Sequence, residues 1–149
     1  PEFFIEAIAD NGAALGISFV PAESIGSGSR TDSNSDGDSA THTASADLKA
    51  HAMIYFDYPV YTNFYLKGGV SMTTIETTES LNSGSTYDNQ DVMGYTIGLG
   101  YKADLGSFYY KVEAAYTDFE DYEDNSAASN KITASTESTA YKFSLGYKF

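Results

Sequence analysis

The 149-residue chain has no cysteine, no tryptophan and only three prolines. Without cysteine it has neither a disulfide framework nor a zinc–thiolate site. A run of 18 apolar residues is also missing, so no transmembrane helix is expected. Basic residues are scarce, with eight Lys and Arg against 21 Asp and Glu, which gives a net charge of −13. Because nucleic-acid phosphates require Lys and Arg, this charge argues against nucleic acid as a partner.

What the chain does have is a two-residue alternation of apolar and polar side chains, clearest in its last eleven residues. One phase of this stretch holds Tyr141, Phe143, Leu145, Tyr147 and Phe149, and the other holds Lys142, Ser144, Gly146 and Lys148. Successive side chains of a strand point to opposite faces, so the pattern predicts a strand with one apolar and one polar face. A strand tilted by about 45° crosses the hydrocarbon layer in roughly 9 to 11 residues. The stretch therefore has the length and the two faces of a transmembrane β-strand.

The same alternation predicts seven strands along the chain. They span residues 2–9, 13–20, 45–58, 64–75, 93–102, 108–117 and 139–149. Short turns at 10–12, 59–63 and 103–106 alternate with long polar segments at 21–44, 76–91 and 118–137. The composition of the long segments predicts mobile loops. Short turns on one side and long loops on the other are typical of an outer-membrane barrel.

Seven strands leave an open edge, which the lipid interior does not tolerate. Following the alternation backwards, we expect a long loop before Pro1 and an eighth strand before that loop. The chain then begins inside a larger precursor, or its missing strand comes from elsewhere. The fold prediction is an all-β, antiparallel, up-and-down transmembrane β-barrel of eight strands. Seven of these strands lie in this chain, within a single domain over residues 1–149.

Charge is distributed unevenly between the predicted strands and loops. The three long segments hold 14 of the 21 acidic residues and two basic ones, a net charge of −12. Every strand lysine falls on the polar phase, where it avoids the cost of about 2 to 4 kcal/mol for a Lys facing lipid near the midplane. These residues predict a packed ionic network in the lumen: Glu2, Glu6, Lys49, Asp57, Lys67, Lys102, Lys111, Glu113, Lys142 and Lys148. Gly94, Gly98 and Gly100 are expected to leave space for bulky inward neighbours such as Tyr55, Tyr65 or Tyr109.

Together these features resemble the small bacterial outer-membrane β-barrel proteins of the OmpA and OmpX type. The C-terminal strand carries the most specific likeness. Its residues Tyr141, Phe143, Leu145, Tyr147 and Phe149 look like the signal read by the barrel-assembly machinery. The resemblance implies a bacterial outer-membrane location, lipid and the assembly machinery as partners, and a structural, adhesive or receptor role. It carries over no catalytic residue.

Specific chemistry has few candidates in this sequence. Asp32, Asn34, Asp36 and Asp38 fall in the half-motif D-x-N-x-D-G of a calcium loop, although Thr43 stands where the bidentate Glu belongs. The alternative interpretation is a solvated acidic loop that collects divalent cations such as Ca²⁺ weakly. Ser71, Ser144 and His51 are common lumen fillers, and we expect no enzyme.

The expected function is a structural or surface-interaction role, with the long acidic loops contacting an unknown extracellular partner. One alternative is a narrow porin-like channel with a lysine-lined lumen, which a closed bore would exclude. A second alternative is a soluble virion or fibre β-protein whose aromatic face packs on another sheet, and solubility without detergent would select it.

Overall fold

The computed structural model describes residues 1–33, 39–80, 89–125 and 131–149. All regular structure in these residues is β-strand. The strands are β1 (Phe3–Ile8), β2 (Ala14–Val20), β3 (Glu23–Ser33), β4 (Ser39–Tyr61), β5 (Phe64–Ser80), β6 (Gln90–Leu105), β7 (Phe108–Phe119), β8 (Tyr122–Asn125), β9 (Lys131–Ala134) and β10 (Glu137–Tyr147). No helix long and apolar enough to cross a membrane occurs in this described part of the chain.

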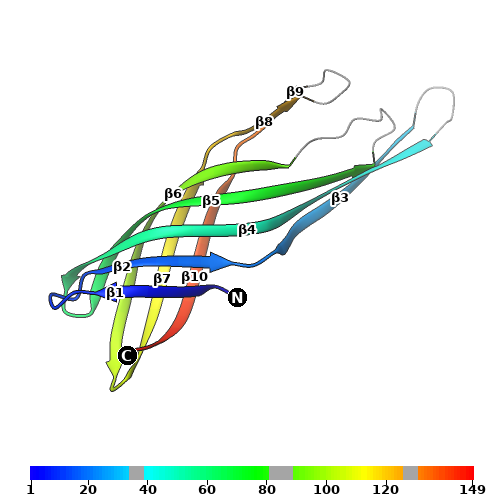
Figure 1. Cartoon of the computed structure of the whole chain (residues 1–149). Helices are drawn as coiled ribbons and strands as arrows, with labels where there is room; N and C mark the ends of the chain where they lie inside the picture. The colour runs from blue at the N-terminus through cyan, green and yellow to red at the C-terminus, as the bar shows by residue number, and fades with distance from the viewer. Residues whose placement is uncertain (34–38, 81–88, 126–130) are drawn as a thin grey trace.

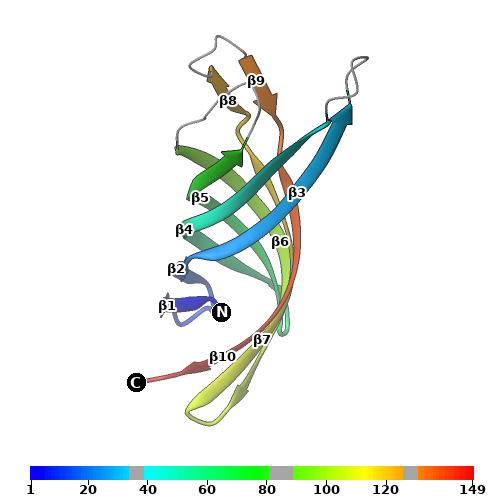
Figure 2. The ribbon, with the colours of Figure 1, turned by 90° about the vertical axis from the view of Figure 1, so that its right-hand side faces the viewer.

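Seven of the strands form one antiparallel sheet in the order β1-β2-β4-β5-β6-β7-β10, and β3 pairs with the far part of β4. The sheet curls into a half-barrel, with β1 and β10 at its two edges (Figures 1 and 2). The seven predicted strands of the antiparallel sheet are therefore confirmed. Each pairs with the neighbour expected from an up-and-down order, because short hairpins favour antiparallel neighbours.

The three short turns lie at one end of the sheet, and each contains a residue with positive φ. Gly12 and Gly106 have φ values of 86° and 70°, and Thr62 has a φ of 47°. The Asn11 side chain accepts a hydrogen bond of 3.0 Å from the Ala13 amide, which closes the first turn. Positive φ is what a tight hairpin requires, so the sequence signals at these turns act locally.

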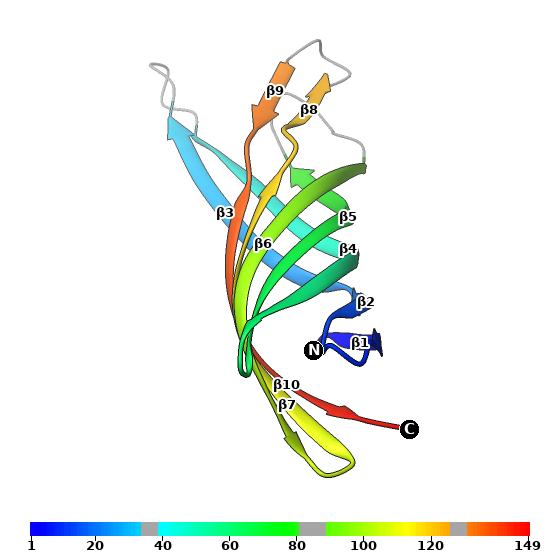
Figure 3. The same cartoon turned by 90° about the vertical axis from the view of Figure 1, so that its left-hand side faces the viewer.

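The long polar segments were predicted to be loops, but their described residues include β-strands. In the segment 21–44, residues 23–33 form β3, which pairs with the start of β4 so that Thr31 opposes Thr41, and β5 extends to Ser80. The segment 118–137 contains the small β8–β9 hairpin (Figure 3). Ser and Thr pair across strands by backbone and hydroxyl hydrogen bonds without an apolar face. Low hydrophobicity therefore did not prevent strand formation here.

The two faces of the curled sheet are opposite in character. On the convex face large apolar side chains are exposed, and Ile97 and Phe143 each keep 68% of their surface accessible. On the concave face lie buried polar and charged side chains, including Asp57, Lys67 and Glu113. The fold thus buries its charges and exposes its hydrophobic residues, which is the reverse of the usual arrangement in a soluble protein.

Candidate functional site

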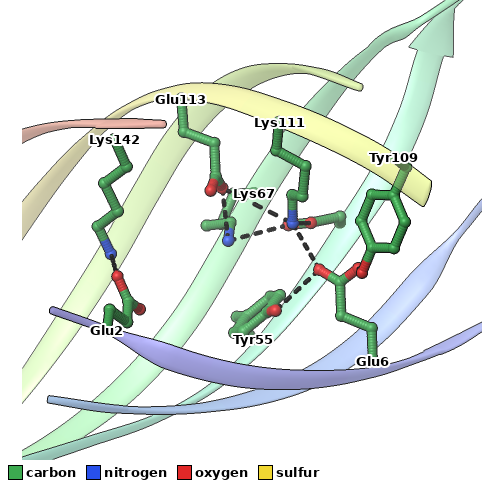
Figure 4. A network of polar contacts seen from close by, with 9 residues as sticks. Glu2, Glu6, Tyr55, Lys67, Tyr109, Lys111, Glu113 and Lys142 are labelled. Atoms are coloured by element: carbon green, nitrogen blue, oxygen red, sulfur yellow. Dashed lines mark hydrogen bonds and ion pairs between the residues drawn. The ribbon is translucent and has the colours of Figure 1, made fainter. Parts of the chain in front are cut away.

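Charged side chains from four strands converge at the centre of the concave face (Figure 4). The Lys111 ammonium of β7 donates to Glu6 Oε1 of β1 at 2.5 Å and to Asp57 Oδ2 of β4 at 2.6 Å. Only 1% of the Lys111 surface is accessible. Since a buried ion needs a partner, the two carboxylates hold this lysine in place.

A second lysine completes the cluster. The Lys67 Nζ of β5 lies 2.6 Å from Glu113 Oε1 of β7 and 3.5 Å from Asp57 Oδ1. When all five groups are ionised, three carboxylates and two ammonium groups leave one net negative charge. We call Glu6, Asp57, Lys67, Lys111 and Glu113 the central ion cluster.

Tyrosine rings enclose the central ion cluster. The hydroxyls of Tyr55 and Tyr109 donate to the two carboxylate oxygens of Glu6, at 2.8 and 2.9 Å. The Lys67 ammonium lies 3.6 Å from the ring centroid of Tyr55, in a cation–π contact. Hydrogen bonds and ring contacts thus supplement the ion pairs, as a charged group out of water requires.

Three of the inward tyrosines lie directly opposite glycines on the neighbouring strand. Tyr55 opposes Gly16, Tyr65 opposes Gly100 and Tyr109 opposes Gly146. A Cβ built on any of these glycines would come within 2.1 to 2.3 Å of the facing tyrosine ring. Each ring therefore occupies the space that a side chain on the facing glycine would need. We call these the three Tyr–Gly pairs.

The residues predicted to form one lumen network do not all belong to the central ion cluster. Lys142 of β10 forms an ion pair of 2.7 Å with Glu2, which directly precedes β1. The Lys102 ammonium lies 5.7 Å from the ring centroid of Tyr109, beside the central cluster.

Two of the predicted lumen lysines lie away from the central cluster. The Lys49 ammonium pairs with the Glu76 carboxylate where β4 extends past β2. Lys148 pairs with the exposed Asp104 at 2.6 Å, beside the β6–β7 turn. Lys49 lies at a register shift of β4 and Lys148 lies just past the end of β10, and both are exposed.

Other predicted residues have different outcomes. Tyr141, Phe143, Leu145 and Tyr147 alternate outward along β10, and Phe149 is exposed beyond it. Asp32 lies in β3 opposite Ala40, whereas Asn34, Asp36 and Asp38 fall outside the described residues. In the described ranges no three His, Cys, Asp or Glu side chains are placed to hold a metal ion. His51 Nδ1 shares a hydrogen bond of 2.7 Å with the Thr73 hydroxyl.

No family model, curated protein or solved structure matches the chain.

Sequence reasoning anticipated space beside the inward tyrosines but not which glycines provide it. Gly100 faces Tyr65 as expected, whereas Gly94 faces Phe119 and Gly98 faces Ala115. Gly16 and Gly146 were missed. Each of these glycines lies on the polar face of its strand, directly opposite a tyrosine on the polar face of the next strand. Such a pair can be found in the sequence only when the register between the two strands is known.

Proposed function

We propose that the protein is a structural β-barrel of the bacterial outer membrane, with a surface-interaction role for its acidic segments. The observation that carries this proposal is the reversed polarity of the sheet. Lys111 is fully buried on the concave face, while Ile54, Ile97 and Phe143 are among the large apolar side chains exposed on the convex face. Lipid is the solvent that makes this arrangement favourable.

Aromatic side chains at the short-turn end support the membrane proposal. Phe64 and Tyr101 pack edge to face with ring centroids 5.2 Å apart, and Phe108 and Tyr147 do so at 5.1 Å. Tyr61 is exposed beside them. Aromatic rings favour the boundary between hydrocarbon and water, so this end suits one membrane interface.

The central ion cluster favours a structural role over transport. Lys67 and Lys111 are each paired with carboxylates, and Lys111 Nζ lies 5.2 Å from the ring centroid of Tyr55 and 5.0 Å from that of Tyr65. A lysine-lined anion channel would need accessible ammonium groups. We therefore expect no conductance above background in planar bilayers. Steady single-channel currents would favour the porin-like alternative.

The long segments provide the surface for interaction. They contain β3 and the β8–β9 hairpin, which extend past the seven-stranded sheet at the end opposite the short turns (Figure 1). Their composition gives this end nearly all of the net negative charge. A partner with a basic surface is the natural complement.

The deciding experiment is electrophoretic mobility in SDS with and without boiling, on protein extracted by detergent from the membrane fraction. A lipid-embedded barrel resists SDS when cold, so we expect a heat-dependent shift in mobility. An unshifted band from protein that stays soluble without detergent would mean that the convex face packs on protein. The virion or fibre alternative would then replace the membrane proposal.

A further inference from the structure

Lys102 of β6 has different surroundings from the other lysines. Within the described residues, five lysines form ion pairs with carboxylates, namely Lys49, Lys67, Lys111, Lys142 and Lys148. Lys102 is half-buried, and no carboxylate of a described residue forms an ion pair with its ammonium. Because a charge that is partly removed from water normally has a partner, this amine is an exception in the interior.

The strand register places Lys102 next to a like charge. Lys111 of β7 lies directly opposite Lys102. Like charges at opposite positions of neighbouring strands destabilise each other. On its other side Lys102 lies beside the neutral residue Asn63, whose carbonyl accepts a hydrogen bond of 2.8 Å from the Lys102 amide. The two neighbours across the sheet therefore supply a cation and a neutral side chain, and neither is a carboxylate.

The carboxylates that act on Lys102 from further away are Glu6, Asp57 and Asp104. Each of them is bonded to another lysine. Lys111 holds the first two at 2.5 and 2.6 Å, and Lys148 holds the third at 2.6 Å. The ring centroid of the buried Tyr109 lies 5.7 Å from Lys102 Nζ, near the outer limit of a cation–π contact. Partial burial thus removes water from the Lys102 amine without giving it a counter-ion.

We infer that Lys102 is a nucleophilic amine that captures small uncharged aldehydes as imines. Desolvation and a cationic neighbour are the two conditions that activate a lysine amine for attack on a carbonyl group. Lys102 meets both, and it keeps enough exposure for a small molecule to reach Nζ, whereas Lys111 is buried. This binding activity goes beyond the proposed function, and it holds whether the convex face meets lipid or protein.

The reaction is a condensation without any change of oxidation state. The lone pair of Lys102 Nζ forms a bond to the carbonyl carbon, and the π electrons of the carbonyl group move to its oxygen. The two amine protons and this oxygen then leave as one water molecule, and a C=N bond remains. The surroundings select an uncharged aldehyde, because an anionic one would approach Glu6 and a cationic one would approach Lys111. The ring of Tyr109 beside the amine favours a small apolar group on the aldehyde.

Reductive trapping tests the inference on the whole chain in detergent micelles. Propionaldehyde and sodium cyanoborohydride are added near neutral pH, so that each imine is reduced to a stable secondary amine, and peptide mass spectrometry measures the rate at each lysine. We expect Lys102 to react on the order of tenfold faster than Lys49 and Lys148, which are more exposed but bonded to carboxylates.

A second labelling reaction separates activation from exposure. Trace acetylation with acetic anhydride at about pH 11, above the ordinary range in which lysine is protonated, compares amines that are all neutral. Under these conditions the half-buried Lys102 should react more slowly than the exposed Lys49 and Lys148.

Lys111→Met is the informative variant, because it leaves Glu6 without its cation close to Lys102. The Lys102 ammonium should then pair with Glu6, and its trapping rate near neutral pH should fall to that of Lys148. An unchanged rate in the folded variant would overturn the inference. If circular dichroism shows that the variant does not fold, the two labelling reactions on the unaltered chain decide the question.

Two results on the unaltered chain would also overturn the inference. One is that Lys102 reacts with the aldehyde no faster than Lys49 and Lys148 near neutral pH. The other is that Lys102 leads by the same factor in acetylation at alkaline pH, since exposure alone would then explain its rate. Heat-dependent mobility in SDS reports on the membrane proposal independently.

Discussion

At the scale of single residues, Lys111 is the group on which the interior depends most. Its ammonium joins Glu6 of the edge strand β1 to Asp57 of β4, and water does not reach it. A buried ion pair adds little net stability, but removing one partner leaves charges without compensation. The neighbouring carboxylates would then repel each other in a medium that screens poorly.

Lys111→Met keeps the volume of the side chain and removes its charge. We expect a loss of about 3 to 5 kcal/mol in the free energy of unfolding, because Glu6 and Asp57 stay buried without this cation. Denaturant unfolding in detergent micelles measures it. Lys148→Met is the matched control, since its partner Asp104 is exposed, and it should cost about 1 kcal/mol or less. Equal losses in the two variants would contradict the assignment of Lys111 as the central cation.

The Tyr–Gly pairs make a steric prediction. Gly100→Ala places a methyl group about 2.1 Å from the Tyr65 ring, so the ring or the backbone must move. We expect a loss of about 1 to 3 kcal/mol, as for other overpacked cores. Gly68→Ala is the control, because a Cβ at Gly68 meets nothing within 4 Å. The pairing would be refuted if thermal unfolding shifted equally in both variants.

At the scale of elements, each strand of the sheet has two environments with opposite requirements. In β6 the outward row Met93, Tyr95, Ile97 and Leu99 is exposed, whereas Val92 and Thr96 on the other face are buried. Register ties the faces of adjacent strands together, because a slip of one residue would bring every apolar side chain inward. The outward row therefore reports on what surrounds the sheet.

Ile97→Arg tests that environment. Near the middle of a lipid-facing row, an arginine should cost about 2 to 4 kcal/mol, while Leu105→Arg beside the β6–β7 turn should cost about 0 to 1. Unfolding from lipid vesicles in denaturant measures both values. If Ile97→Arg changed stability by less than about 0.5 kcal/mol, as surface substitutions in water do, the convex face would not meet lipid.

At the scale of the whole molecule, charge is separated between the long polar segments and the remainder of the chain. The long segments have a net charge of −12, and the remainder of the chain has a net charge of −1. The negative electrostatic potential of the molecule is therefore concentrated at the end that carries the long segments. Salt screens such a field over a Debye length of about 10 Å at 0.1 M.

Vesicles that contain the protein should consequently adhere to a polylysine surface at low salt and detach between about 0.02 and 0.5 M NaCl, as the Debye length shortens. Surface plasmon resonance measures the retained vesicles. A variant with Asp121→Asn, Glu123→Gln and Asp124→Asn should detach at lower salt, because it has three fewer negative charges. Identical salt profiles would show that the acidic segments do not make the contact.

Much of the fold was readable in the sequence because strand alternation and hairpin turns are local. Glycine at 12 and 106 and the alternation from Tyr141 to Tyr147 each predict their structure within a few residues. The β3–β4 hairpin was not predicted, since its Ser- and Thr-rich strands have no apolar face to reveal them. The amino-acid composition of a segment indicates how much apolar surface it can bury. It does not show whether the segment forms hydrogen bonds to a neighbouring strand.

The sequence by itself determined which face of each strand is apolar and the direction in which successive strands run. Only the tertiary structure decided which inward groups meet. Glu6 and Lys111 are 105 residues apart in the chain, and their side-chain atoms lie 2.5 Å apart, while Lys49 and Lys148, predicted to face the lumen, lie away from the cluster. Phase is a property of one strand with a period of two residues. Contact across a curled sheet depends on the accumulated register and curvature of all seven strands, which no local pattern specifies.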